Sequence, residues 1–180
     1  AALSITTLMH ATVRDTVNIN RGWQFHLGPL SGVSDMRTAK TQTVNLPHDF
    51  LINQPWVEPD ASERPDNSDA GSNVRSRLSP RGFKEMNTGW YRYELTPAAE
   101  WKGRRVMLDF QGIMLVGDVW VNGELVGGTD YGYLGFDIDI TDRLRFDSPN
   151  EIVVKADTRE PNNSRWYTGG GLYRDVNIIV

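Results

Sequence analysis

The strongest constraint on the fold is an apolar run that is interrupted by an Asn-Gly pair. Residues 118–126 read DVWVNGELV, so Asn122-Gly123 separates two segments rich in valine, leucine and tryptophan. Asn-Gly supplies the positive φ angles of a type I′ turn, which joins two antiparallel strands through a two-residue loop. The sequence therefore predicts a tight β-hairpin at this place.

Similar short runs recur along the whole chain. Apolar or aromatic residues alternate with polar ones, and glycine or proline often follows. In residues 105–110, for example, the alternation places Val106, Leu108 and Phe110 on one face. Only residues 97–101 indicate a short helical turn, and no amphipathic pattern is long enough for a full helix. About eight to ten strands are expected, which is typical of an all-β sandwich or barrel. Besides the hairpin, they are predicted in residues 17–27, 42–46, 90–95, 105–110, 136–140, 150–157 and 175–180.

Length and charge restrict the class of protein. The 180 residues suffice for a single domain, residues 1–180, with a sizeable core. A net charge of -4 gives no reason to expect nucleic acid or an anionic membrane surface as a partner. No stretch approaches the roughly 20 apolar residues that a membrane-spanning helix needs. Because cysteine is absent, disulfides and thiolate metal sites are excluded.

The acidic residues and histidines show no catalytic or metal-binding pattern. Asp137, Asp139 and Asp142 form the densest carboxylate cluster, but alternation places the first two on the solvent side of a strand. A calcium site at this cluster would lack a recognisable ligand spacing. The three histidines show neither zinc nor triad spacing; they are His10, His26 and His48. We therefore assign no metal, no cofactor and no catalytic residue to this chain.

Several other residues are expected to have structural roles. His48 and Asp49 are predicted to hold their turn by hydrogen bonds rather than perform acid-base chemistry, and Arg174 and Asp175 to form a salt bridge. Core packing is favoured for Trp90 and Trp120, whereas Trp56 lies where a contact at the rim of a site is plausible.

One region departs from the strand pattern. Between residues 51 and 88, proline, glycine and polar residues dominate, which predicts a long loop. Loops of this length inside a compact domain are uncommon and tend to be functional or disordered. At its C-terminal end, the sequence stops on the apolar Ile178-Ile179-Val180, which suggests continuation into another domain.

The segment RWYTGGGLYR, residues 165–174, is the main candidate for function. Tryptophan and tyrosine rings stack on the C–H faces of pyranose sugars, and an arginine offers a fixed fork of donors to hydroxyl groups. The three glycines allow the backbone to approach a ligand closely. Alternatively, the glycines only build a turn or bulge, with Trp166 and Tyr173 in the core. Residue types alone favour neither interpretation.

Five motifs together resemble the N-terminal sugar-binding domain of glycoside hydrolase family 2. They follow the order of that family and cover nearly the whole chain: RGWQFHLG at 21–28, VNLPHDF at 44–50, GWYRYEL at 89–95, VWVNGELVG at 119–127 and RWYTGGGLYRDV at 165–176. The resemblance implies a jelly-roll β-sandwich that is followed by an immunoglobulin-like domain and a (β/α)8 catalytic barrel.

The resemblance also implies a reaction and a branch of the family. The last motif is closer to β-galactosidases than to β-glucuronidases, whose segment usually ends in Asn-Tyr-Ala-Gly, and the Trp-Asp-Trp signature of β-mannosidases is absent. The parent enzyme would be an exo-acting, retaining hydrolase of terminal β-glycosides. Its catalytic glutamates belong to the barrel, which needs about 250 residues. This chain is therefore not expected to hydrolyse glycosides alone.

Within the resemblance, Arg165 and Trp166 are the expected sugar-facing residues, with Asn162, Asn163 and Ser164 beside them. Some relatives have aspartate near the Ser164 position, so Arg165 is expected to take over that contact. The implied partners are a carbohydrate and the downstream domains of the same polypeptide, in a periplasmic or secreted bacterial enzyme. Two alternatives stay open: a free-standing lectin-like module, and a scaffold without carbohydrate contact.

Overall fold

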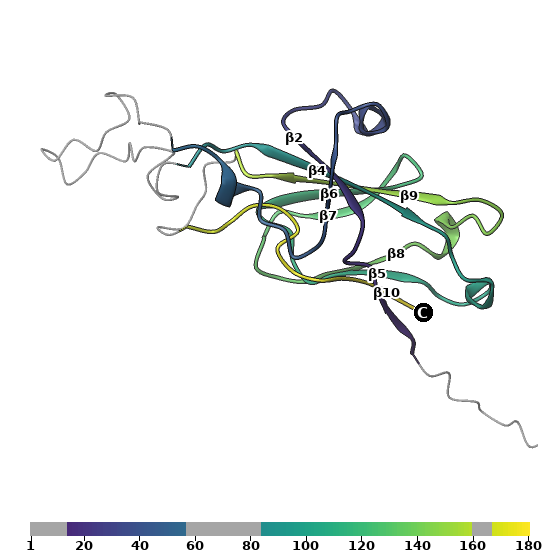
Figure 1. The fold of residues 1–180 in the computed structure, drawn as a ribbon. Helices are drawn as coiled ribbons and strands as arrows, with labels where there is room; N and C mark the ends of the chain where they lie inside the picture. The colour runs from purple at the N-terminus through teal and green to yellow at the C-terminus, as the bar shows by residue number, and fades with distance from the viewer. Residues whose placement is uncertain (1–13, 57–83, 160–166) are drawn as a thin grey trace, which may run out of the picture.

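The computed structural model describes residues 14–56, 84–159 and 167–180, which form a two-layered β-sandwich (Figure 1). The four-stranded sheet has the order β1 (Thr16–Asn18), β10 (Val176–Ile179), β5 (Met107–Phe110), β8 (Phe136–Asp139). The six-stranded sheet has the order β3 (Gln42–Val44), β2 (Trp23–Leu27), β4 (Thr88–Leu95), β9 (Asn150–Asp157), β6 (Val116–Val121), β7 (Glu124–Thr129). All pairings are antiparallel. The expected all-β jelly-roll sandwich is thus confirmed.

The predicted hairpin joins β6 and β7. Asn122 and Gly123 both have positive φ, 53° and 86°, as a type I′ turn requires. The Asn122 side chain also donates to the backbone oxygen of Arg143 at 2.8 Å and accepts from the Glu151 amide at 3.1 Å. The turn is therefore tied to Arg143 and to the start of β9 as well as to its own strands.

The strand predicted at residues 17–27 is wrong as a single element. β1 ends at Asn18 and β2 begins at Trp23, and the two strands belong to different sheets. Gly22, with φ of 82°, allows the chain to turn between them. The Trp23 indole donates to the Ile19 backbone oxygen at 2.6 Å, which holds this crossing in place.

The inward faces of the two sheets form the main core. Val106, Leu108 and Phe110 are all at most 1% exposed, as their alternation predicts. The short helical turn expected at 97–101 is present as η5 (Ala99–Trp101), with Trp101 buried. Three further short 3₁₀ turns lie in the described part of the chain: η1 (Val33–Arg37), η2 (Leu51–Asn53) and η6 (Thr141–Arg143).

Trp90 and Trp120 lie outside this main core. Trp90 is nonetheless buried in a smaller core cluster, so the core packing predicted for it is confirmed, whereas Trp120 is only half-buried against that cluster. Both point outward from the six-stranded sheet, where they stack on each other with ring centroids 5.7 Å apart. With Val153 and Met36 they form a second, smaller cluster. The cluster exists because the segment that carries η1 rises over the outer face of the sheet (Figure 1).

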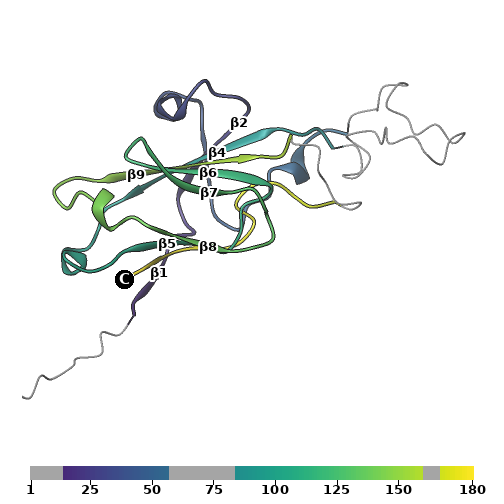
Figure 2. The same ribbon diagram turned by 180° about the vertical axis from the view of Figure 1, so that it is seen from behind.

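One end of the sandwich is marked by the ends of four neighbouring strands. At this end β4 and β6 begin, and β7 and β9 end. Figure 2 shows the same arrangement from behind. The chain has cis peptide bonds at Leu46-Pro47 and Met114-Leu115, and the second of these directly precedes β6 at this end. This end carries the candidate site.

Candidate functional site

Asp49 joins two segments that are far apart in the sequence. Its Oδ1 accepts hydrogen bonds from the Leu51 amide at 3.0 Å and the Gly170 amide at 2.9 Å. Its Oδ2 accepts from the Tyr167 hydroxyl at 2.7 Å. We call this set of four residues the Asp49 junction. One carboxylate thereby fixes the end of the glycine-rich loop, and the predicted hydrogen-bonding role of Asp49 is confirmed.

Backbone contacts reinforce the same junction. The Phe50 amide donates to the Gly170 oxygen at 3.0 Å, and the His48 amide donates to the Leu172 oxygen at 2.8 Å. On the other side of the loop, Met114 and Gly171 exchange two backbone hydrogen bonds of 2.9 and 2.8 Å. The loop is thus held between the segment around residue 49 and the segment that precedes β6.

Glycine is required where this loop passes over the core. Gly171 has φ of 112°, a conformation that L side chains rarely adopt, and a Cβ there would collide with the Tyr91 hydroxyl. A Cβ on Gly169 would meet Asp49 Oδ2 at 2.9 Å. In the described residues 167–174, the glycines thus permit close packing of the loop on the core, whereas Tyr173, which the alternative interpretation places in the core, is only half-buried.

Beneath the loop, His48 and Tyr91 form a neutral pair. His48 Nδ1 lies 2.9 Å from the Tyr91 hydroxyl. Burial lowers the pKa of His48, although nearby Asp49 acts in the opposite direction, and burial raises the pKa of Tyr91 above its ordinary range. Both groups are consequently uncharged at neutral pH. They support the loop, as expected for His48, and neither is a free acid or base.

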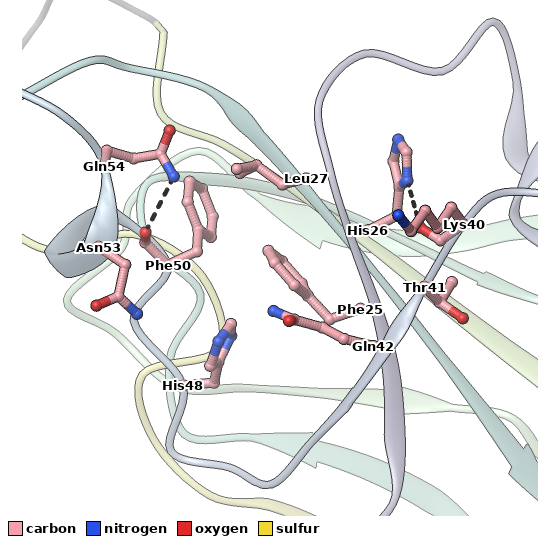
Figure 3. A pocket seen from close by; sticks show the side chains of 10 residues that line it. All are labelled: Phe25, His26, Leu27, Lys40, Thr41, Gln42, His48, Phe50, Asn53 and Gln54. Carbon is pink, nitrogen blue, oxygen red and sulfur yellow. Dashed lines mark hydrogen bonds between the residues drawn. The ribbon is translucent and has the colours of Figure 1, made fainter.

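A pocket of about 480 Å³ opens beside the junction (Figure 3). One wall comes from the η2 segment and the other from β2 and the start of β3. Its floor is aromatic, since Phe25, His48 and Phe50 pack against one another. Polar side chains surround this floor, namely His26, Lys40, Thr41, Gln42, Asn53 and Gln54. An aromatic floor with a polar rim can accommodate a hydroxyl-bearing ring.

The five residues predicted to face the sugar lie outside the described residues. They are Asn162, Asn163, Ser164, Arg165 and Trp166. The structure instead describes the residue that follows them, Tyr167, which is 43% exposed. The Tyr167 contact to Asp49 was missed, although both residues lie within motifs of the family resemblance. No local signal links them, because 118 positions separate the two side chains.

Two further expectations concern residues near this end. Arg174 does not pair with Asp175: it lies over the Tyr173 ring and donates to the Gln111 oxygen at 3.3 Å, while Asp175 accepts from Asn20 at 2.8 Å. The predicted salt bridge is therefore wrong, because adjacent residues project in different directions. Trp56 is 70% exposed and has the Lys84 ammonium over its ring.

The carboxylate cluster, Asp137 and Asp139 of β8 with Asp142 of η6, lies exposed at the surface. Asp139 accepts hydrogen bonds from Thr141 and Arg105, and these contacts, Thr141 first, hold its pKa below the usual value. Among the described residues, histidines and acidic residues form no group that could hold a metal ion. In the same part of the chain, no helix is long and apolar enough to cross a membrane.

Comparison with known proteins identifies the domain. Residues 82–166 match the family described as glycosyl hydrolase 2 galactose-binding domain-like. The β-galactosidase BoGH2A of Bacteroides ovatus is 32% identical over 91% of the chain, which covers 18% of that protein. A β-glucuronidase of Bacteroides fragilis is 26% identical over 96% of the chain, which covers 21% of that protein.

Solved structures agree with this match. A β-glycosidase from Bacteroides vulgatus superimposes with a TM-score of 0.74 at 30% identity, over 92% of this chain and 20% of that one. The chain thus spans about a fifth of the length of these relatives. Motif order, sandwich topology and these matches agree: the chain belongs to the galactose-binding-like N-terminal domains of glycoside hydrolase family 2.

Proposed function

We propose that this chain is the sugar-binding N-terminal domain of an exo-acting, retaining β-glycosidase. In this proposal it packs on a catalytic barrel and contributes the loop with Arg165 and Trp166 to the sugar pocket. An immunoglobulin-like domain and the barrel follow in the same polypeptide, and the barrel supplies the two catalytic glutamates. The enzyme acts in the periplasm or outside the cell.

The observation that carries the proposal is the Asp49 junction. It fixes Tyr167 and Gly170, directly after the predicted sugar-facing residues, to the rigid sandwich. A loop that contributes to a pocket must be held in position, because small misplacements of contacting groups weaken substrate binding and orientation. In the junction, the partly buried Asp49 carboxylate and the Tyr167 hydroxyl hold the loop in position.

The substrate class that we favour is a terminal β-galactoside. The match of 32% identity is to a β-galactosidase, whereas the β-glucuronidase is 26% identical. In addition, the segment after Trp166 reads YTGGG rather than the Asn-Tyr-Ala-Gly form. A galactoside is neutral and a glucuronide is anionic. We therefore expect the enzyme to hydrolyse the two substrates at clearly different rates, which an assay of each can measure.

The test uses the complete polypeptide that contains this chain. We expect it to hydrolyse 4-nitrophenyl β-D-galactopyranoside faster than the corresponding β-D-glucuronide. Arg165→Ala and Trp166→Ala should each lower kcat/KM for the galactoside by about 10- to 100-fold, as expected for the loss of a substrate contact. Asp137→Asn, on the exposed face of β8, is the control and should leave kcat/KM unchanged.

Different outcomes separate the alternatives. Unchanged kcat/KM in both loop variants, with a lower stability of the fold, would indicate a scaffold without sugar contact. Saturable galactoside binding by the chain that is lost in Trp166→Ala, without any hydrolysis by the complete polypeptide, would indicate a lectin-like module. Faster hydrolysis of the glucuronide would reassign the substrate class.

A further inference from the structure

A second pocket, of about 330 Å³, lies on the outer face of the six-stranded sheet. Thr88 and Trp90 of β4, Asp118 and Trp120 of β6, and Lys155 of β9 form its floor. The segment of residues 29–33 forms the opposite wall. No lining residue is shared with the pocket of Figure 3 or with the Asp49 junction. Its volume lies near the lower limit for ligand pockets, about 300 Å³, and suits one small ring.

Two polar atoms of this floor are buried without a partner. The Trp90 side chain is 4% exposed and the Thr88 side chain 2% exposed, and strand alternation places both on the outer face. Neither Trp90 Nε1 nor Thr88 Oγ1 has a hydrogen-bond partner in the described part of the chain. Buried polar groups in native proteins are nearly always paired. Because an indole N–H only donates, any partner of Trp90 Nε1 must supply an acceptor atom.

The charges around the pocket compensate one another. Lys155 Nζ lies 3.6 Å from both Asp118 and Asp157, and Arg159 pairs with Asp157 at 2.6 Å. Burial alone would raise the pKa of Asp157, but hydrogen bonds from Arg159 hold it below the usual value. Two carboxylates and two cations therefore face the same region, which disfavours a charged ligand. The 3.6 Å distance between Asp118 and Lys155 is too long for a hydrogen bond, so both side chains can still form hydrogen bonds to a neutral ligand.

The aromatic part of the floor is suited to a ring with an apolar face. Trp90 and Trp120 stack at an interplanar angle of 23°. Trp120 is half-buried, so part of its indole borders the pocket. A pyranose offers C–H groups on one face and hydroxyls around its edge, and thus complements indole rings that are flanked by donors and acceptors.

From these observations we propose that the Trp90–Trp120 pocket is a second carbohydrate site, which binds one neutral pyranose residue independently of the Arg165–Trp166 loop. The ring packs on the exposed part of the Trp120 indole, and its hydroxyls pair with Asp118 and Lys155, while Trp90, stacked on Trp120, lies next to the bound ring. The site lets the domain hold a glycan at a position other than the one that is cleaved.

The experiment follows the indole N–H signals of the ¹⁵N-labelled chain by NMR during titration with methyl β-D-galactopyranoside and methyl β-D-glucopyranoside. Trp90→Phe assigns the Trp90 signal. We expect a saturable shift of this signal with at least one glycoside, and binding of D-galacturonate at least tenfold weaker. The absence of any shift of the Trp90 signal with both glycosides overturns the proposal.

Two matched variants locate the binding. Asp118→Ala removes a carboxylate that is 41% exposed, so folding is retained, and it should weaken binding about tenfold or more. Asp137→Ala, an exposed carboxylate on the other sheet, should leave binding unchanged. Equal affinity of both variants contradicts the proposal. Loss of binding in Trp166→Ala also contradicts the proposal, because the sugar would then bind at the Arg165–Trp166 loop and not in the Trp90–Trp120 pocket.

Discussion

At the scale of single residues, Asp49 is the side chain on which the candidate site depends most. Its two oxygens receive donors from η2, from Gly170 and from Tyr167. Asp49→Ala should lower the free energy of unfolding by about 2–3 kcal/mol, since hydrogen bonds to charged groups contribute about 1.5–3 kcal/mol. Urea denaturation of the chain measures this loss.

A double-mutant cycle isolates the part of this effect that holds the loop. Tyr167→Phe removes only the hydroxyl, and Asp49→Asn replaces the accepting Oδ2 by a donor. We expect a coupling free energy of about 1 kcal/mol between the two substitutions, as is usual for directly contacting groups. Strict additivity of the two losses would show that the 2.7 Å contact does not stabilise the loop.

Gly171 presents a second residue-level case, because its conformation and its surroundings both exclude a side chain. We expect Gly171→Ala to destabilise the chain by about 3 kcal/mol or more, since backbone strain and overpacking each cost about 1–3 kcal/mol. The control is Gly123→Ala, where φ is also positive but nothing lies within 4 Å of the added Cβ. Its loss should be about 1–2 kcal/mol, which reflects the conformation alone. Equal losses in urea denaturation would disprove the steric argument.

At the scale of elements, Glu151 attaches the η1 segment to the six-stranded sheet. It pairs with Arg37 of η1 at 2.9 Å and with Arg92 of β4 at 2.7 Å. Burial opposes the charged form, but the two arginines outweigh it and lower the pKa of Glu151 from its ordinary value of 4.5. Because the folded state has the lower pKa, the stabilisation is present above pH 4.5 and is lost as pH falls through the folded pKa.

Glu151→Gln should therefore lower the free energy of unfolding by about 1–2 kcal/mol at neutral pH. The loss is no larger because Arg37 is largely exposed, so solvent partly screens its ion pair with Glu151. The difference from the unmodified chain should shrink as pH falls below 4.5. Glu124→Gln, which breaks an exposed pair with Arg143, is the control and should cost no more than about 0.5 kcal/mol. A loss in Glu151→Gln that does not depend on pH would contradict the ionic explanation.

The elements also show what sequence can predict. The Asn122-Gly123 hairpin was predicted because its turn chemistry is local to two residues. The break between β1 and β2 was not, since it depends on which sheet each strand joins. The outward position of Trp90 follows from alternation with Tyr91, but its burial depends on a segment that folds over the sheet. Likewise, Asp49 was recognised as a turn residue, whereas its partner Gly170 lies 121 positions away.

At the scale of the whole molecule, one end of the sandwich concentrates the candidate sugar contacts. The Asp49 junction, the pocket of Figure 3 and residue 167 lie there, whereas the Trp90–Trp120 pocket occupies the outer face of one sheet. The relatives are about five times longer than this chain. If both proposals hold, the Arg165–Trp166 loop contacts the sugar that is cleaved, and the Trp90–Trp120 pocket binds another residue of the same glycan.

The acidic residues near these surfaces argue that catalysis requires the rest of the polypeptide. A retaining glycosidase needs one carboxyl group as nucleophile and one as acid/base, about 5–5.5 Å apart beside the sugar. Asp49 already accepts three hydrogen bonds, and Asp157 is paired with Lys155 and Arg159. We therefore expect the purified chain to release no 4-nitrophenolate from 4-nitrophenyl β-D-galactopyranoside, whereas the complete polypeptide does. Hydrolysis by the chain that disappears in Asp49→Asn would place a catalytic carboxylate in this domain and refute its assignment as a non-catalytic partner of the barrel.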